Sequence, residues 1–454
     1  MDQVSISTIA EWAGGGLSRG SAAAEAAFVC TDSRALKPGA LFVALRGEKF
    51  DGHDFIRQAA QSGAAGAVVC QEPPPDLPAD FALIRVADTL AALQQMAAGY
   101  RRTLPMKVVN ITGSNGKTST KDFTAEVLAR RGRVAKTEGN LNNHIGLPLT
   151  ILRASREDNF GVFEIGMNHP GEIAPLARIA RPDAAVITNI GVAHIEYMGS
   201  IEAIAQEKGM LVEAVGSDGF VVLPADDAFT KSIAARTRAK VIRAGLDRGE
   251  VYASDVVADA EGSTFVAHAC GLSAPGRLNA PGRHMVLNAM LAVAVGLEYG
   301  VPLDECMEGL SQAKLTKGRL ERKMVRGICI LDDSYNANPD SMVAALETLG
   351  RMPGRRIAVL GQMNELGAES ARGHRLVGET AARENIDCVI TVGNIAAAIA
   401  SAALAHGVRH ALTAQSTAEA ALILRSLARN GDTVLIKGSR SVRMETIVEE
   451  LARP

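Results

Sequence analysis

A glycine-containing turn in the first third of the chain has the composition of a phosphate-binding loop. It consists of Gly113, Ser114, Asn115, Gly116, Lys117, Thr118 and Ser119. A β-branched run precedes the turn, and apolar residues at helical spacing follow it. Glycines let backbone N–H groups approach anionic oxygens, and the start of the following helix adds partial positive charge. The pattern predicts that Lys117 reaches the β- and γ-phosphates of a nucleotide and that the Thr118 hydroxyl ligates Mg²⁺.

The turn departs from the full Walker A pattern at one position, where Ile111 replaces the first glycine. A bare Gly-Lys-Thr at the start of a helix is common by chance. The order of strand, turn and amphipathic helix nevertheless favours a functional phosphate loop over a purely structural turn.

Two further strand ends carry side chains that can complete a metal site. Glu164 lies at the end of the apolar run 160–165, and His194 follows the apolar run 184–189. Open α/β sheets bind ligands at the carboxyl ends of parallel strands, and Mg²⁺ prefers oxygen donors. Glu164 is therefore a candidate magnesium ligand, with a strand-end glutamate facing solvent as the alternative. A single histidine is more often structural than a ligand, so His194 alone decides little.

The helix predicted after His194 has a lysine in its apolar face. Lys208 lies in the middle of this face, whereas Glu207 is expected to point away from it. A desolvated lysine is costly unless something compensates its charge. The amine can snorkel to the surface, pair with a buried anion, or react with CO₂ to give a carbamate with two oxygen donors for a second Mg²⁺ beside His194. The residues alone favour snorkelling.

A third acidic strand end lies near residue 333. Asp332 and Asp333 follow the apolar run that begins at Ile328, and a polar loop leads from there to Pro339. Such a loop can hold a ribose or nucleotide phosphates, but aspartate, asparagine and proline are also ordinary turn formers. Cations and hydroxyls near other strand ends suit an anionic substrate, with surface solvation as the alternative. They are Arg319, Lys437, Ser439 and Arg440.

The elements that must position these residues follow an α/β pattern. Strand-like runs alternate with helical ones, which predicts doubly wound, mostly parallel sheets. At about 150 residues per domain, a chain of 454 residues corresponds to about three domains. Two polar stretches place the boundaries near residues 105 and 318, so the expected domains are 1–105, 106–318 and 319–454. The runs expected to form strands are 40–45, 107–112, 160–165, 184–189, 220–223, 328–332, 356–360, 387–392 and 433–436.

The composition argues against several classes of protein. Lys and Arg number 48 against 50 Asp and Glu, and a net charge of −2 does not suit a non-specific nucleic-acid binder. The 47% of hydrophobic residues argues against intrinsic disorder. The first residues lack the apolar core of a signal peptide, no run suffices for a membrane span, and the six cysteines are widely spaced. These features predict a cytoplasmic protein with neither nucleic acid nor a membrane as its partner.

Together these blocks resemble the Mur ligase family, which comprises ATP-dependent amide-bond-forming enzymes of peptidoglycan synthesis. Within the family, the Thr-Asp-Ser-Arg block and the Asn-Leu-Asn-Asn block favour the branch that adds D-alanyl-D-alanine. Besides the phosphate loop, the resemblance rests on Thr31–Arg34, Gly39–His53, Gly139–Pro148, Glu164–Glu172, Asn189–His194, Pro281–Asn288, Gly318–Arg319, Asp332–Asn338 and Lys437–Arg440.

The resemblance implies three α/β domains: a small N-terminal domain that binds a UDP-sugar, a central P-loop ATPase with a mostly parallel sheet, and a C-terminal Rossmann-like domain. It implies a cytoplasmic, monomeric ligase that uses ATP and two Mg²⁺ ions. The implied substrates are UDP-N-acetylmuramoyl-tripeptide and D-alanyl-D-alanine, joined through an acyl phosphate to give the pentapeptide precursor of the cell wall.

The resemblance also implies roles for individual residues. It assigns the phosphate loop to ATP, Thr118 and Glu164 to one Mg²⁺, and His194 with a carbamylated Lys208 to the second. The residues implied to be catalytic are Lys117, His194, Lys208 and Arg319. Further nucleotide contacts are implied for Asn288, Arg319 and Asp333, and contacts to the sugar nucleotide for Ser33 and Arg34.

One block departs from the family pattern, because Gln362 stands where an acidic residue is usual. We therefore leave Gln362 out of the candidate site. Two kinds of alternative remain: another ligase of the superfamily, such as a folylpolyglutamate synthetase, or a P-loop switch protein that binds nucleotide and signals through a partner. The switch hypothesis leaves Glu164, His194 and Lys208 unexplained.

Overall fold

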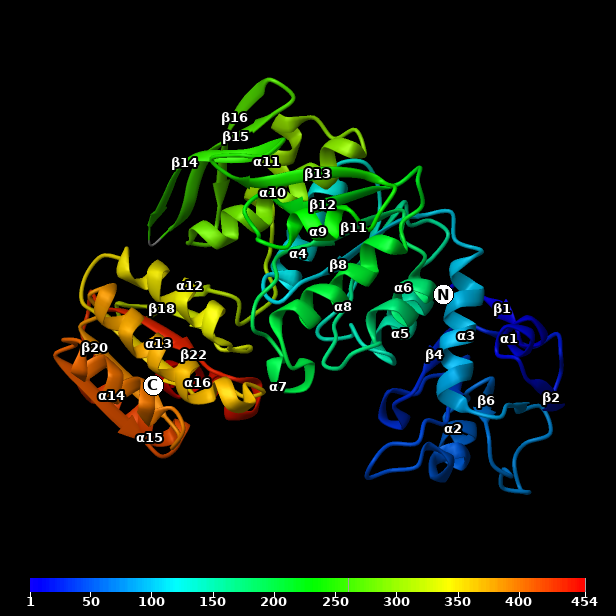
Figure 1. Ribbon diagram of the computed structural model, residues 1–454. Helices are drawn as coiled ribbons and strands as arrows, with labels where there is room; N and C mark the ends of the chain where they lie inside the picture. Colours follow the sequence, from blue (N-terminus) through cyan, green and yellow to red (C-terminus); the bar gives the residue numbers. More distant parts are fainter. Residues whose placement is uncertain (260, 454) are drawn as a thin grey trace.

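The structure, a computed structural model that describes residues 1–259 and 261–453, is organised around three main sheets that follow one another along the chain. Figure 1 shows three lobes, with the N-terminal lobe at the right, the central lobe at the top and the C-terminal lobe at the lower left. Helices cover the sheets in each lobe. The predicted α/β class with a mostly parallel central sheet is confirmed.

The first lobe is built on a small sheet in which β4 to β7 run parallel and β2 pairs antiparallel with β7. In spatial order its strands are β2 (Gly16–Arg19), β7 (Ala82–Arg85), β6 (Gly66–Val69), β5 (Ala40–Val43) and β4 (Phe28–Cys30). A separate antiparallel pair joins β1 (Val4–Ser5) and β3 (Glu25–Ala26). The helices are α1 (Ile6–Trp12), η1 (Ser33–Ala35), η2 (Gly52–Phe55), α2 (Ile56–Gln61) and α3 (Thr89–Arg101).

The second lobe contains the largest sheet, in which neighbouring strands from β9 to β14 are parallel. Its spatial order is β16 (Leu272–Leu278), β15 (Gly262–Ala269), β14 (Val251–Asp259), β13 (Lys240–Leu246), β12 (Phe220–Pro224), β11 (Ala184–Ile187), β8 (Lys107–Thr112), β10 (Phe160–Glu164) and β9 (Val134–Lys136). Its helices are α4 (Lys117–Leu128), α5 (Gly146–Arg153), α6 (Ile173–Ala180), α7 (Ile195–Met198), α8 (Ile201–Glu213), α9 (Thr230–Ala234), α10 (Arg283–Glu298) and α11 (Leu303–Gln312).

The parallel order of this sheet explains how residues far apart in sequence meet. Strand β8 lies between β10 and β11, and apolar residues cover both of its faces. The carboxyl ends of the three strands therefore open onto one edge. That edge carries the phosphate loop after β8, Glu164 at the end of β10, and the loop to His194 after β11.

The antiparallel extension of the central sheet is absent from the sequence predictions. Strands β14, β15 and β16 form a meander at one end of the sheet, and α10 and α11 pack against it. In β14, buried and more exposed residues alternate, which is the period-2 signal of a strand with one solvated face. The short polar residues of this segment obscure that signal in the sequence.

Helix α3 connects the first lobe to the second. Asp88 caps its N-terminus, and the helix packs on α1 of its own lobe and on α5 and α6 of the next. At the other end, the buried guanidinium of Arg101 donates to the carbonyls of Ala180 (2.9 Å) and Leu104 (3.1 Å). These bonds hold the linker after α3 against the central lobe.

The third lobe has a parallel sheet with one antiparallel edge strand, β17. In spatial order its strands are β17 (Glu321–Val325), β18 (Ile328–Asp333), β22 (Thr433–Lys437), β19 (Arg356–Gly361), β20 (Cys388–Val392) and β21 (His410–Ala414). Its helices are α12 (Pro339–Gly350), η3 (Gly367–Glu369), α13 (Ser370–Arg383), α14 (Ala397–Ala405), α15 (Thr417–Leu427), η4 (Arg440–Val442) and α16 (Glu445–Ala452). All four predicted strands of this lobe are present.

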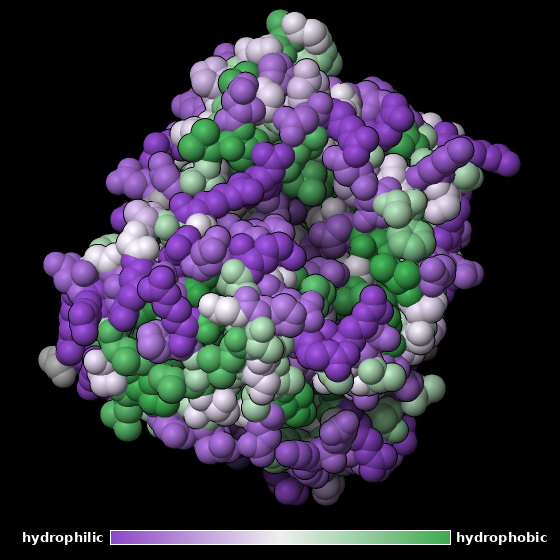
Figure 2. Space-filling model, turned by 60° about the vertical axis from the view of Figure 1, so that its left-hand side comes forward, coloured by the Kyte–Doolittle hydropathy of each residue, from purple (hydrophilic) through white to green (hydrophobic). Residues whose placement is uncertain are grey.

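Hydrophilic side chains predominate on the face shown in Figure 2, with apolar groups in scattered patches. Within residues 1–259 and 261–453, no helix has the length and apolar character that crossing a bilayer requires. The six cysteines are all free thiols.

Candidate active site

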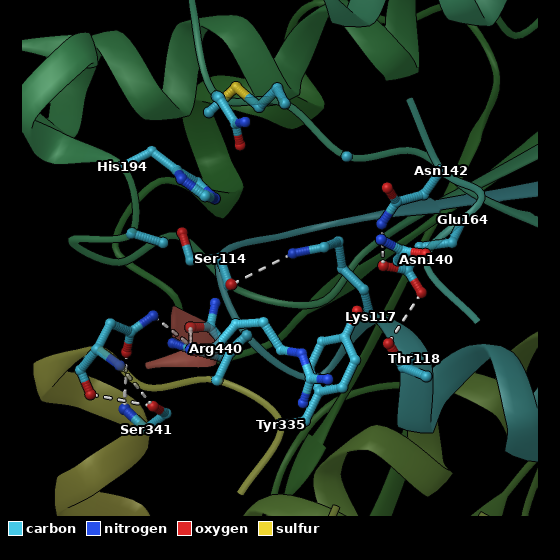
Figure 3. A pocket seen from close by; sticks show the side chains of 18 of the residues that line it. Ser114, Lys117, Thr118, Asn140, Asn142, Glu164, His194, Tyr335, Ser341 and Arg440 are labelled. Atoms are coloured by element: carbon cyan, nitrogen blue, oxygen red, sulfur yellow. Dashed lines mark hydrogen bonds between the residues drawn. The ribbon is translucent and has the colours of Figure 1, made fainter. Parts of the chain in front are cut away.

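A cavity of about 1160 Å³ lies between the central and third lobes and is lined by residues from both. Figure 3 shows Lys117, Thr118, Glu164 and His194 of the central lobe on one side and Tyr335 and Arg440 of the third lobe on the other. Most of the predicted site residues line this cavity: Ser114, Asn115, Gly116, Lys117, Thr118, Ser119, Glu164, His194, Asn288, Arg319 and Asp333. Gly113, Lys208, Ser33 and Arg34 do not belong to its lining.

Backbone shape enforces the phosphate loop. Gly113 and Gly116 have φ values of +149° and +79°, which disfavour any residue with a Cβ. A Cβ would also collide with the Thr188 hydroxyl at the first position and with the Asn288 amide at the second. The two glycines therefore let the loop pack more closely against its neighbours than residues with a Cβ could. At the start of α4, the N-cap residue Gly116 has no side chain that could bond to the backbone N–H groups of the first turn.

The exit of strand β11 holds the phosphate loop in place. The Ser114 hydroxyl donates to the carbonyl of Gly191 (2.9 Å) and accepts from the backbone N–H of the same residue (2.8 Å). The backbone N–H of Asn115 donates to the side-chain oxygen of Asn189 (2.9 Å). Hydrogen bonds thus join two adjacent strand-end loops at this edge of the sheet.

Lys117 is folded back over the loop to which it belongs. Its Nζ donates to the carbonyl oxygens of Gly113 (2.8 Å) and Ser114 (3.3 Å). Burial lowers the pKa of Lys117, with Glu164 opposing the shift and Arg319 adding to it. The amine is held where an anionic ligand of the loop would replace its carbonyl partners.

Glu164 is buried and hydrogen-bonded, so it is not a strand-end glutamate facing solvent. Its carboxylate is 3% exposed and accepts from the Thr118 hydroxyl (2.9 Å) and from the Asn142 side-chain amide (2.8 Å). Among the described residues, no group of three or more His, Cys, Asp or Glu forms a complete metal cage. Mg²⁺ in nucleotide sites typically takes one or two protein oxygens and completes its shell with phosphates and water. Thr118 and Glu164 fit that pattern.

His194 is positioned by a contact between lobes. It begins α7 with φ of +61°, and its imidazole points into the cavity (Figure 3). The Nδ1 atom donates to Oε2 of Glu365 in the third lobe at 2.5 Å. Glu365 is absent from the sequence predictions, although it lies in the loop after the predicted strand 356–360, because its contact joins loops that are far apart in the chain.

Lys208 is buried, and this excludes the snorkelling that the residues alone favour. The residue is 1% exposed on α8, which packs against β8 and β11. Desolvation moves the pKa of Lys208 well below its ordinary value, and the positive charge of Lys117 adds to this shift. In the described part of the chain, no hydrogen bond or ion pair forms at its Nζ. Burial therefore favours the neutral form of this amine.

The structure corrects the expectation for Glu207. Its carboxylate is only 6% exposed and accepts from the backbone N–H groups of Gly171 and Ile173, each at 2.9 Å. These N–H groups belong to the start of α6, where negative charge is favourable. A periodicity argument that considers one helix alone misses this partner, because α6 lies beside α8 only in the folded chain.

The third lobe contributes two cations and their partners. The Arg319 guanidinium lies over the Tyr335 ring, 4.1 Å from its centroid, and approaches the Thr118 hydroxyl at 3.4 Å. Lys437 donates to Asp333 at 2.5 Å, and burial lowers the pKa of Lys437 against the opposing effect of this carboxylate. Asp333 thereby balances a buried charge beside the cavity.

The start of α12 contacts the central lobe directly. The Asn338 side-chain amide donates to the Asn115 side-chain oxygen at 2.8 Å, and Asp340 accepts from the backbone N–H of Val192 at 3.1 Å. Desolvation raises the pKa of Asp340. The Asn338-Pro339 pair signals a helix start in the sequence, but its contact with the phosphate loop is a product of the tertiary structure.

Ser33 and Arg34 lie apart from the cavity, in the first lobe. They follow β4 at the carboxyl end of the small sheet, and Arg34 forms an exposed ion pair with Asp32 at 2.7 Å. The block Gly39–His53 contains β5, and its later residues follow that strand at the same edge of the sheet. The structure thus groups these residues with each other and not with the phosphate loop.

Comparison with known proteins identifies the family. Models described as "Mur ligase family, catalytic domain", "Mur ligase middle domain" and "Mur ligase, glutamate ligase domain" match residues 25–101, 111–296 and 318–440. The UDP-N-acetylmuramoyl-tripeptide–D-alanyl-D-alanine ligase of Escherichia coli K12 is 39% identical to the chain, and the match covers 93% of each.

Solved structures agree with the sequence matches. MurF from Acinetobacter baumannii superposes with a TM-score of 0.91 at 34% identity, covering 100% of this chain and 99% of that one. MurF ligase from Thermotoga maritima in complex with ADP gives a TM-score of 0.84 at 29% identity, covering 94% and 97%. The chain belongs to the Mur ligase family.

Proposed function

We propose that the chain catalyses the ATP-dependent addition of D-alanyl-D-alanine to UDP-N-acetylmuramoyl-tripeptide in peptidoglycan synthesis. The observation that carries this proposal is one cavity in which the phosphate loop faces Arg319 of another lobe, in a chain 39% identical to a ligase named for this reaction. The chain is an enzyme, and it uses ATP. The products are the sugar-linked pentapeptide, ADP and phosphate.

The chemistry explains why a carboxylic acid must meet ATP in this cavity. A carboxylate and an amine do not form an amide spontaneously in water. Transfer of the γ-phosphoryl group to the terminal carboxylate of the tripeptide gives an acyl phosphate and ADP. The amine of D-alanyl-D-alanine then attacks the acyl carbon, a proton is lost and phosphate leaves. Lys117 and Arg319 reduce the repulsion between the attacking carboxylate and the triphosphate.

We assign the predicted metal ligands as two sets. Thr118 and Glu164 would hold one Mg²⁺, and His194 with Lys208 would hold the second. When bound, these ions supply charge neutralisation of the phosphates. A neutral buried amine is the form that reacts with CO₂, and the carbamate that forms on Lys208 carries two oxygen donors. The first set is supported by Thr118 and Glu164 lining the cavity, and the second by His194 in the same lining and by a desolvated Lys208 that is affected by the charge of Lys117.

Other residues receive roles from their positions. Asn288, Arg319 and Asp333 are proposed to contact the nucleotide, together with the phosphate loop from Gly113 to Ser119. Ser33 and Arg34 are proposed to bind the sugar nucleotide at the carboxyl end of the first sheet, where α/β sheets bind ligands.

We propose domain boundaries at 1–105, 106–318 and 319–454, because each range contains one of the three main sheets. We further propose that the chain acts as a monomer, since every residue assigned to the site comes from one chain. Sedimentation at working enzyme concentrations tests this state. ATP and nucleotide-linked sugars are metabolites of the cytoplasm, which is the compartment we propose.

Phosphate release measured with the sugar tripeptide, with and without D-alanyl-D-alanine, tests the function. We expect phosphate release to depend on both substrates and to match the pentapeptide formed. An equal rate with a single amino acid as the acceptor would indicate another ligase of the superfamily. Slow ATP hydrolysis that no amine accelerates would indicate a nucleotide switch and overturn the proposal.

A further inference from the structure

The contact between His194 and Glu365 joins the two walls of the cavity. Glu365 follows β19 of the third lobe, and its carboxylate lies 2.5 Å from the imidazole Nδ1 of His194. Both side chains are partly shielded, at 19% and 38% exposure. Both residues line the cavity.

The backbone on each side is shaped for this contact. His194 and Glu365 both have left-handed φ values, +61° and +60°, which cost free energy for residues with a side chain. The backbone N–H of Glu196 donates to the carbonyl of Glu365 at 3.2 Å. Gly367, with φ of +49°, lies against Glu196. Two loops in uncommon conformations thus meet at one carboxylate–imidazole bond.

The carboxylate of Glu365 can fix which nitrogen of the His194 imidazole carries the proton. A partly solvent-accessible ion pair contributes less to stability than two left-handed residues cost, so stability does not account for this arrangement. A carboxylate at Nδ1 requires a proton on that nitrogen, which leaves the Nε2 lone pair of a neutral imidazole free toward the cavity. Carboxylates that accept from the second nitrogen of a histidine orient ligating imidazoles in metal sites, and their loss costs about 10- to 100-fold in metal affinity.

We propose that Glu365 is a positioning residue, which holds His194 in the Nδ1–H tautomer and aims its Nε2 at the metal beside the phosphate loop. The inference rests on the proposed function, because it assigns His194 to a divalent cation. Since Glu365 belongs to the third lobe, His194 is oriented only when that lobe is docked. The other groups that face Glu365 are the imidazole of His169 and the α7 loop.

Two substitutions of Glu365 test whether its hydrogen bond to His194 is what matters. Glu365→Gln keeps an oxygen that can accept from Nδ1–H, whereas Glu365→Ala removes it. Glu369→Ala is the matched control, because Glu369 ends the neighbouring η3, pairs with Arg372 and does not line the cavity. Circular dichroism and urea unfolding confirm that each variant is folded before further measurement.

The first readout is ¹⁵N NMR of the imidazoles in the full chain, with the His194 signal assigned by its loss in His194→Asn. We expect the Nδ1–H tautomer in the wild type, in Glu365→Gln and in Glu369→Ala, and a mixed population in Glu365→Ala. The second readout is Mn²⁺ binding in the presence of ADP, followed by electron paramagnetic resonance. We expect Glu365→Ala to weaken the second ion about 10- to 100-fold and Glu365→Gln to weaken it only a few-fold.

The outcomes distinguish this inference from the proposed function. An unchanged tautomer and unchanged Mn²⁺ affinity in folded Glu365→Ala would overturn the positioning role, even if the wild type forms the pentapeptide. A wild type that forms no pentapeptide would overturn the proposed function, whereas the tautomer measurement would still report whether Glu365 orients His194.

Discussion

The two walls of the cavity are constructed in different ways. The central wall is organised around the seven-residue loop Gly113–Ser119, whose two glycines have positive φ values and which is tied to Asn189 and Gly191. The third-lobe wall consists of single side chains from separate loops and strand ends: Arg319, Asp333, Asn338, Glu365 and Lys437. The central wall is therefore preorganised by its own backbone, whereas the opposite wall acts only when the lobes are docked. Substitutions in the first should damage chemistry, and substitutions in the second should damage docking.

The largest effect is expected for Lys117→Ala. Removing the cation from the phosphate loop should lower ATP-dependent turnover by about 100- to 1000-fold, the usual cost of losing one preorganised electrostatic contact. Phosphate release measures the change. Lys136→Ala, a substitution of a lysine outside the cavity lining, serves as the control and should retain turnover. Retained activity in Lys117→Ala would break the assignment of the central wall.

Lys208→Ala should also lower ligation strongly, by at least about 100-fold if the carbamate is a metal ligand. Added bicarbonate should not restore it, because the amine that reacts with CO₂ is gone. The substitution removes the buried methylene stem together with the desolvated amine, so the cost of the cavity opposes the gain from losing the amine, and urea unfolding measures the net change in the free energy of unfolding. Turnover near that of the wild type would remove the carbamate assignment.

A smaller effect is expected when docking alone is disturbed. Asn338→Asp keeps the oxygen that caps α12 through the Ser341 backbone N–H but loses the amide that donates to Asn115. We expect a several-fold rise in the KM for ATP, at unchanged stability, and weaker compaction in small-angle scattering when nucleotide and sugar tripeptide are added. Equal compaction in the variant and the wild type would show that this contact does not report docking.

The last prediction concerns the stability of the chain at acid pH and not its turnover. Burial lowers the pKa of His284, at the start of α10, from 6.5 to about 4, and the nearby Asp333 opposes this shift only in part. The unfolded chain therefore binds more protons than the folded chain between these values. Stability should be complete above pH 6.5 and should fall as the pH drops toward 4, by at most about 1.4 kcal/mol per pH unit.

Urea unfolding at pH 7 and pH 5 measures this loss. His284→Asn removes the titrating group, so the variant should lose less stability than the wild type between the two values. An equal loss in both proteins would show that other groups control acid stability.

Much of the fold was accessible from the sequence where strands are buried on both faces. The predicted runs at 107–112, 160–165 and 184–189 became β8, β10 and β11, because a parallel strand under two helix layers is almost continuously apolar. The meander β14–β16 escaped prediction because one of its faces is solvated and polar residues interrupt its apolar ones. Edge strand β21 escaped for the same reason, as most of its residues are exposed.

The features of the candidate site likewise fall into those that local sequence predicts and those that only the tertiary structure shows. The sequence by itself determined the phosphate loop and the carboxylate at the end of β10, because a turn conformation and a strand end are local properties of adjacent residues. Only the tertiary structure decided that Glu365 meets His194, that Asn338 meets Asn115 and that Glu207 caps α6. Each of these contacts joins two segments that lie far apart in the chain. The segments meet because whole sheets and helices pack together, and the spacing of residues within one segment does not predict which distant segment it will contact.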